Sequence, residues 1–78
     1  MNDKLDTKER KELPDSMFGL PEIREYPMPD AAHVRAAEAY FRYCPEELKP
    51  TLARAILRFA NEYGVDVGSP TVREYADM

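Results

Sequence analysis

The positions of the prolines constrain this 78-residue chain more than any other feature. Between residues 13 and 29 prolines occupy positions 14, 21, 27 and 29. Each removes a backbone donor and biases the preceding residue toward extended geometry, so a regular helix is excluded there. The same segment is rich in large apolar residues, among them Phe18, Leu20, Ile23, Tyr26 and Met28. We therefore predict an extended arm over 13–29 that covers part of the core, without a partner strand and without a sheet.

Two long segments after the arm have the composition and the apolar spacing of helices. Asp30 is a good N-cap for a helix over 30–44. A second helix is predicted over 45–63, with a short turn at its first residues, 45–49, and an end at Gly64, which readily adopts the left-handed conformation that terminates helices. The residues expected to be buried are Val34, Ala37, Phe41 and Cys44 on the first helix and Leu52, Ile56, Phe59, Ala60 and Tyr63 on the second.

The overall prediction is an all-α fold: an antiparallel two-helix hairpin, covered by the extended proline-rich N-terminal arm, with a short C-terminal third helix. The third helix is predicted from Ser69-Pro70, an N-cap serine before a first-turn proline, within a tail over 68–78. Residues 13–67 form one small domain, and the charged residues 1–12 are expected to be flexible. A core this small is marginal alone, so we expect a homo-oligomer or docking on a partner.

Composition excludes several classes of function. The net charge is −4, which disfavours nucleic-acid binding because that relies on many contacts from Lys and Arg to phosphate. One cysteine and one histidine give neither an internal disulfide nor a zinc site, and no other cofactor is predicted. The chain lacks an apolar run of the roughly 20 residues that a membrane helix needs, and its first residues lack the apolar stretch of a signal peptide.

Few residues in the chain carry chemistry. His33 lies near the start of the first helix, where it either binds an anion or a proton or hydrogen-bonds the helix cap, and the second role is the commoner one. Cys44 ends that helix and is expected to be a buried thiol. The sequence contains no nucleophile–base pair, phosphate-binding loop or metal-ligand spacing. We therefore predict no catalytic residue and expect a protein that is not an enzyme.

A binding surface is the remaining candidate for a functional site. Five tyrosines in so short a chain suit an interface, or they rim the core with their hydroxyls in water. Arginines on both predicted helices either converge on a phosphate or carboxylate or form surface ion pairs. The candidate binding residues are Arg24, Tyr26, His33, Arg35, Tyr40, Arg42 and Tyr43.

The pattern from residue 13 to about residue 67 resembles a small domain of unknown function that is common in bacteriophage genomes. The resemblance rests on Leu-x-Asp-Ser at 13–16, Phe-Gly-Leu-Pro-Glu at 18–22, Arg24, Tyr26-Pro27, Asp-x-x-His-Val-Arg-x-Ala at 30–37, Pro-Glu-Glu at 45–47 and Tyr63-Gly64. The Asp-x-x-His-Val-Arg piece is its most specific element. The family usually has basic residues around Arg24, whereas this sequence has Glu22 and Glu25 on either side of that arginine.

The resemblance implies a phage or prophage origin, as a stand-alone protein or as a part appended to a head maturation protease, and it implies no known activity. We therefore expect a non-enzymatic interaction module that docks on a phage or host protein, with head assembly as one setting. It would act in the cytoplasm of the bacterial host or in the virion. The alternative is a counter-defence protein that inhibits a host immune factor, or that sequesters a nucleotide signal with His33, Arg35 and stacked tyrosines.

Overall fold

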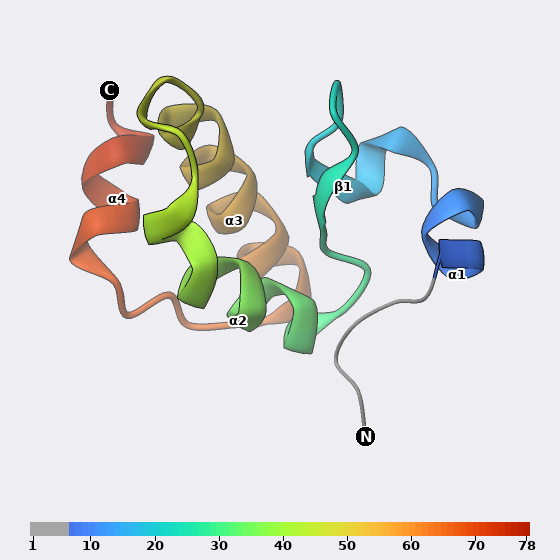
Figure 1. Cartoon of the computed structure of the whole chain (residues 1–78). Coiled ribbons are helices and arrows are strands. Elements are labelled where there is room, and N and C mark those ends of the chain that lie inside the picture. The colour runs from blue at the N-terminus through green and yellow to red at the C-terminus, as the bar shows by residue number, and fades with distance from the viewer. Residues whose placement is uncertain (1–6) are drawn as a thin grey trace.

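The computed structural model describes residues 7–78, whose arrangement is shown in Figure 1. Its α-helices are α1 (Thr7–Glu12), α2 (Ala31–Tyr40), α3 (Lys49–Tyr63) and α4 (Pro70–Ala76). The remaining elements are the strands β1 (Phe18–Leu20) and β2 (Glu25–Pro27) and the short 3-10 helices η1 (Asp15–Met17), η2 (Phe41–Tyr43) and η3 (Glu46–Leu48). The flexibility expected for residues 1–12 lies partly outside the described residues, and the described part of that segment contains α1.

The segment predicted as an extended arm contains a β-hairpin, so the expected all-α fold, a two-helix hairpin with a covering arm and a third helix, is wrong. β1 and β2 pair antiparallel, with Phe18 opposite Pro27 and Leu20 opposite Glu25. Pro27 is tolerated because it ends an edge strand, where its missing N–H is not needed. The segment therefore contains no α-helix, as the prolines predict, but the prolines do not exclude a sheet.

Left-handed backbone at two ordinary residues shapes this hairpin. Arg24 has a φ of 51° at the end of the turn, and Tyr26 has a φ of 61° within β2. Residues other than glycine are uncommon in this region, and each costs roughly 1–3 kcal/mol. Neither position carries the glycine or asparagine that marks such turns, and each strand has three residues, too few for an alternating pattern to show. The sequence therefore gives no signal for the pairing of the two strands.

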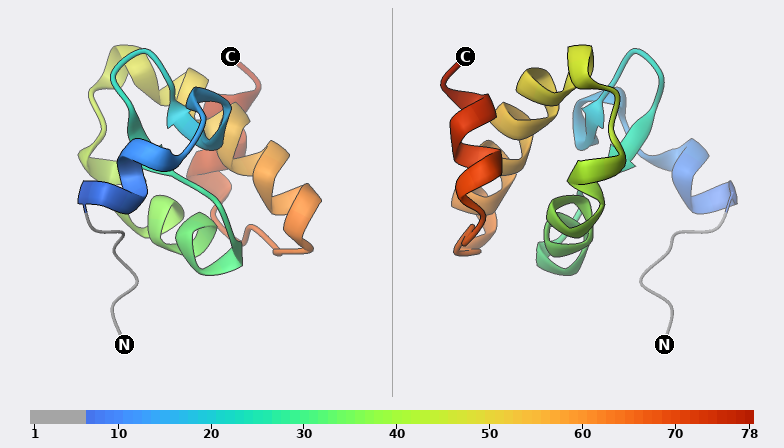
Figure 2. Two further views of the ribbon diagram at one scale, coloured as in Figure 1. Left: turned by 90° about the vertical axis from the view of Figure 1, so that its right-hand side faces the viewer. Right: turned by 60° about the vertical axis from the view of Figure 1, so that its left-hand side comes forward.

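α3 is the central element of the fold. It contacts α2, α4 and β1, so these two helices and the hairpin pack on it. Figure 2 shows α4 and the hairpin on different sides of α3, with α1 beyond the hairpin at the edge of the molecule. The hairpin therefore supplies the cover for α3 that the predicted arm was expected to supply, in a different backbone conformation.

The core lies where the helices meet β1. Most of the residues predicted to be buried in the two long helical segments are buried in the structure: Val34, Ala37, Phe41, Cys44, Leu52, Ile56, Phe59 and Ala60. The exception is Tyr63, which is half-buried. In the hairpin segment Phe18, Leu20 and Met28 are buried as well. Ile23 is 57% exposed, although the arm prediction places it in the core. Its exposure is explained by its position in the turn between the two strands.

The helix ends follow the signals in the sequence. The Asp30 carboxylate accepts a hydrogen bond from the His33 backbone N–H at 2.9 Å. The Ser69 hydroxyl accepts one from the Val72 N–H at 3.3 Å, and the third helix begins at Pro70, as predicted. Gly64 ends α3 with a φ of 70°. α2 is shorter than the predicted first helix, because the chain tightens into η2 before the predicted boundary.

Candidate functional site

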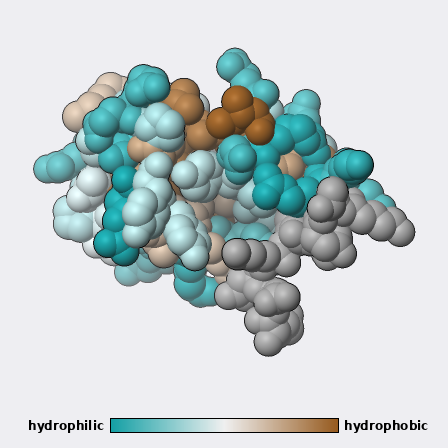
Figure 3. Space-filling view, viewed as in Figure 1, coloured by the Kyte–Doolittle hydropathy of each residue, from teal (hydrophilic) through white to brown (hydrophobic). Residues whose placement is uncertain are grey.

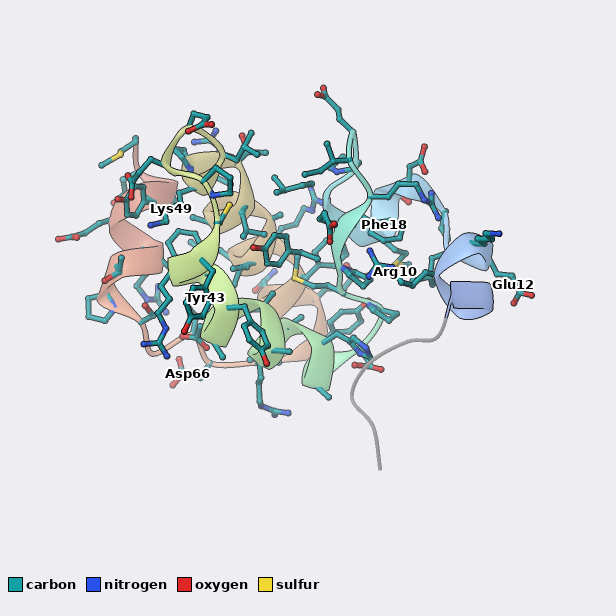
Figure 4. The ribbon with its side chains drawn as sticks, viewed as in Figure 1. Arg10, Glu12, Phe18, Tyr43, Lys49 and Asp66 are labelled. Carbon is teal, nitrogen blue, oxygen red and sulfur yellow. The ribbon has the colours of Figure 1, made fainter. Side chains whose placement is uncertain are left out.

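Two exposed tyrosines and an arginine form one surface where α2 gives way to η2. Tyr40 is 55% exposed and Tyr43 is 70% exposed, and their ring centroids lie 6.2 Å apart. Arg42 places its guanidinium carbon 5.4 Å from the centre of the Tyr43 ring, within the range of a cation–π contact. We call Tyr40, Arg42 and Tyr43 the tyrosine–arginine patch. Figure 4 shows the Tyr43 side chain on the outside of the ribbon.

The change from α-helical to 3-10 geometry positions this patch. Phe41 is 3% exposed and packs edge-on against the Tyr75 ring, with the ring centroids 5.5 Å apart. Cys44 is 4% exposed at the other end of η2. Because both of these residues point inward, the residues between and beside them point outward. Pro45 follows directly, and its missing N–H prevents α2 from continuing through the patch.

The surface formed by α2 and η2 carries two arginines, Arg35 and Arg42. Arg35 is exposed on α2, and neither Arg35 nor Arg42 forms an ion pair with a side chain of residues 10–78. Glu38 accepts a hydrogen bond from the Ser69 backbone N–H at 3.0 Å and forms no ion pair with Arg42 within those residues. Two positive charges therefore lie along this surface in a chain whose net charge is −4.

His33 is turned away from solvent. Its Nδ1 lies 2.7 Å from the Asp30 carboxylate, and its side chain is 13% exposed. Its Nε2 is buried and has no hydrogen-bond partner among the described residues. Burial alone would raise the pKa of Asp30, but the hydrogen bonds from His33 outweigh it and lower that pKa. His33 therefore belongs to the cap of α2, and the structure does not bring it into the tyrosine–arginine patch.

Arg24 is used inside the fold. Its guanidinium donates to the backbone carbonyls of Arg10 at 2.6 Å and Leu13 at 3.1 Å, and to the Asp15 carboxylate. Arg10 in turn donates to the Arg24 carbonyl at 2.7 Å. The Arg24 guanidinium also lies 4.5 Å from the centre of the Phe18 ring, and Figure 4 shows Arg10 close to Phe18 as well. Arg24 thus holds α1 and η1 against the hairpin, and it is not part of the patch.

Tyr26 is half-buried and lies beside the Cys44 thiol rather than in the patch. Burial, followed by the neighbouring thiol, raises the pKa of Tyr26. Burial also raises the pKa of Cys44 and outweighs the lowering effect of Tyr26 and Lys49. A thiol with a raised pKa is a poor nucleophile, because the thiolate is the reactive form. Of the residues predicted for binding, the structure brings together Tyr40, Arg42 and Tyr43, with Arg35 further back along α2.

A second surface is not predicted from the sequence: an apolar depression of about 190 Å³ beside the turn of the hairpin. We call it the hairpin groove, and it is lined by Leu20, Pro21, Glu22, Ile23, Leu48 and Thr51. Figure 3 shows apolar surface near the top of the view, between the hairpin and the helices. The signal for it in the sequence is Ile23, an aliphatic residue in a turn that requires none.

No group of three or more residues that could hold a metal ion occurs in the described part of the chain. Among the helices of residues 7–78, none is both long enough and apolar enough to cross a membrane. Comparisons with protein-family models, curated proteins and solved structures found no significant match. The tyrosine–arginine patch and the hairpin groove are therefore judged on their geometry and chemistry.

Proposed function

We propose that the protein is a non-catalytic interaction module of phage or prophage origin, which docks on a phage or host protein through the tyrosine–arginine patch. The exposure of Tyr40 and Tyr43 beside Arg42 is the observation that carries this proposal. Tyrosine and arginine are enriched at interface centres, because they bury a large area and keep a polar end. The resemblance of residues 13–67 to a phage-associated domain supports the proposed origin.

The charge on α2 and η2 indicates the chemistry of the partner. Arg35 and Arg42 have no acidic ion-pair partner among the side chains of residues 10–78, so an acidic surface would complement them. If the protein acts in head assembly, the acidic surface belongs to a phage structural protein, and the module acts in the host cytoplasm or in the virion. In the counter-defence setting it belongs to a host immune factor.

Site-specific photo-crosslinking in infected cells tests the proposal. Ala39 is exposed and lies next to Tyr40, so a photoreactive amino acid at this position leaves the patch itself intact. We expect a discrete crosslinked product from position 39 and none from position 61, where Asn61 is exposed on α3. The product should disappear when both patch tyrosines are changed to serine. A product that persists in the double variant, or none at all from position 39, contradicts the proposal.

Sequestration of a nucleotide receives less support from the geometry. That alternative relies on His33, whose ring is turned into the cap of α2. A thermal-denaturation screen with linear and cyclic nucleotides separates the two functions, because a ligand at 100 times its Kd stabilises a protein by about 2.7 kcal/mol. We expect no stabilisation. A rise in melting temperature at millimolar nucleotide that is lost in Arg35→Ala would contradict docking as the function and support sequestration.

A further inference from the structure

The hairpin groove exposes apolar side chains that the fold itself does not need. Leu20 forms part of the core at 5% exposure, but Ile23 in the same groove is 57% exposed. Leu48 is half-buried on the opposite wall, just before α3. Turn positions are usually occupied by Gly, Pro, Asn, Asp or Ser, whose conformational preferences favour turns. An isoleucine there contributes apolar surface to the outside of the molecule.

The groove is of a size for a side chain. Its volume of about 190 Å³ lies below the roughly 300–1,000 Å³ of pockets that enclose small molecules. Its walls come from two different parts of the chain, the hairpin turn and the η3–α3 junction. A single large aliphatic side chain inserted between Ile23 and Leu48 would contact both walls and remove both from water.

The rim of the groove is acidic. Glu22 lines it, Glu47 directly precedes Leu48, and both are exposed with no ion pair to a side chain of residues 10–78. The basic residues that follow on each wall are engaged elsewhere. Lys49 bonds the Glu46 carboxylate at 2.8 Å, and Arg24 bonds Asp15 and the carbonyls at the end of α1. One carboxylate, that of Glu22, therefore lines the apolar depression, and the opposite wall has Glu47 as the sequence neighbour of Leu48.

We propose that the hairpin groove binds a short segment of another protein, in which one large aliphatic side chain is flanked by lysine or arginine. The aliphatic side chain fills the depression, and the basic residues pair with Glu22 and Glu47. A second copy of this chain fits less well, because a symmetric contact would bring the same carboxylates together. The site is separate from the tyrosine–arginine patch, and the proposal does not depend on the function proposed for that patch.

Selection from a random twelve-residue peptide library, displayed on filamentous phage, tests the chemistry while the partner protein is still unidentified. The full chain serves as the target, and its Ile23→Asp variant serves as the target for removal of unspecific binders. We expect a consensus with one aliphatic residue and a lysine or arginine on each side. Failure to enrich any peptide, or a consensus without basic residues, overturns the proposal.

Binding of the enriched peptide, followed by fluorescence anisotropy, tests the site. We expect Ile23→Asp to weaken binding at least tenfold and the double variant Glu22→Gln, Glu47→Gln to weaken it about threefold to fivefold, with a loss of salt dependence. Met78→Asp is the matched control, because Met78 is 73% exposed, does not line the groove, and receives the same charge. Equal weakening by this control places the peptide elsewhere and overturns the proposal.

Two further measurements separate this site from its alternatives. Changing both patch tyrosines to serine should leave peptide affinity within twofold, whereas a larger loss would place the peptide on the tyrosine–arginine patch. Sedimentation velocity of the unliganded protein should show the same mass for the parent chain and for Ile23→Asp. A dimer that only the parent chain forms would mean that a second copy occupies the groove, against the proposal.

Discussion

Asp30 combines two effects in one side chain, since it caps α2 and holds the ring of His33. It accepts from the His33 N–H at 2.9 Å and lies 2.7 Å from the ring Nδ1. The sequence predicts the cap, because aspartate before an alanine-rich run is a standard start of a helix. The sequence also allows His33 to hydrogen-bond the helix cap, which is one of the two roles expected for it. It does not predict that Nε2 is buried, since that depends on the packing of α2 against residues distant in sequence.

We expect the stability contributed by the Asp30 charge to depend on pH. The folded pKa of Asp30 is lowered, so this contribution is present above the unfolded pKa of about 3.9 and is lost as pH falls through the folded value. Asp30→Asn keeps a capping oxygen and removes the charge. The difference in unfolding free energy between the parent and Asp30→Asn should shrink from pH 5 to pH 2.5. Because Asp30 is mostly exposed, it should stay below about 1 kcal/mol.

Urea denaturation at the two pH values gives this difference directly, because the other carboxyl groups titrate alike in both proteins. Relative to Asp30→Asn, Asp30→Ala, which removes the capping oxygen as well, should cost about 1 kcal/mol at both pH values. A difference between parent and Asp30→Asn that grows toward low pH would contradict the assigned direction of the pKa shift.

At the scale of elements, the long helices could be predicted and the hairpin could not. Their signals are local: an N-cap, a terminating glycine, and apolar spacing over several turns. β1 and β2 are three residues each, and their pairing depends on left-handed backbone at Arg24 and Tyr26. Neither residue type indicates that conformation, and the contacts with α2 and α3 and the bonds around Arg24 make the hairpin favourable.

Arg24 should therefore control the attachment of α1. Lysine at this position keeps the charge but cannot reach two carbonyls and a carboxylate with a planar fork of donors. We expect Arg24→Lys to increase hydrogen exchange of the backbone amides in 10–13 at least tenfold, while the amides of α3 change little. Arg35→Lys, at an exposed position, is the control and should leave both regions unchanged. Unaltered exchange at 10–13 in Arg24→Lys would show that α1 is held by other contacts.

Considered as a whole molecule, the domain depends on the hairpin for its stability, because β1 packs directly on α3. The sequence indicates this cover correctly from the apolar residues of the segment, although it predicts the wrong backbone. The tyrosine–arginine patch could be predicted in part, since Tyr40, Arg42 and Tyr43 are among the proposed binding residues. The hairpin groove could not, because its walls join only when the turn and the η3–α3 junction meet.

Phe18→Ala tests whether hairpin and helices unfold together. Phe18 is 1% exposed, so its truncation should cost about 3–5 kcal/mol of unfolding free energy. Ile23→Ala in the same hairpin is the control and should cost less than about 0.5 kcal/mol, because Ile23 is largely exposed. Chemical denaturation followed by circular dichroism and by tyrosine fluorescence should give one transition. Two separate transitions, or a cost for Phe18→Ala as small as the control, would show that the hairpin is not part of the cooperative unit.

The packing of β1 on α3 also sets an order of events while the chain is being made. The ribosome synthesises Phe18–Leu20 well before Lys49–Tyr63, the helix that covers this strand. During that interval the apolar side chains of the strand have no partner and are open to chaperones and to contacts with other nascent chains. The native packing of β1 on α3 can therefore form only late in translation, after α3 has emerged.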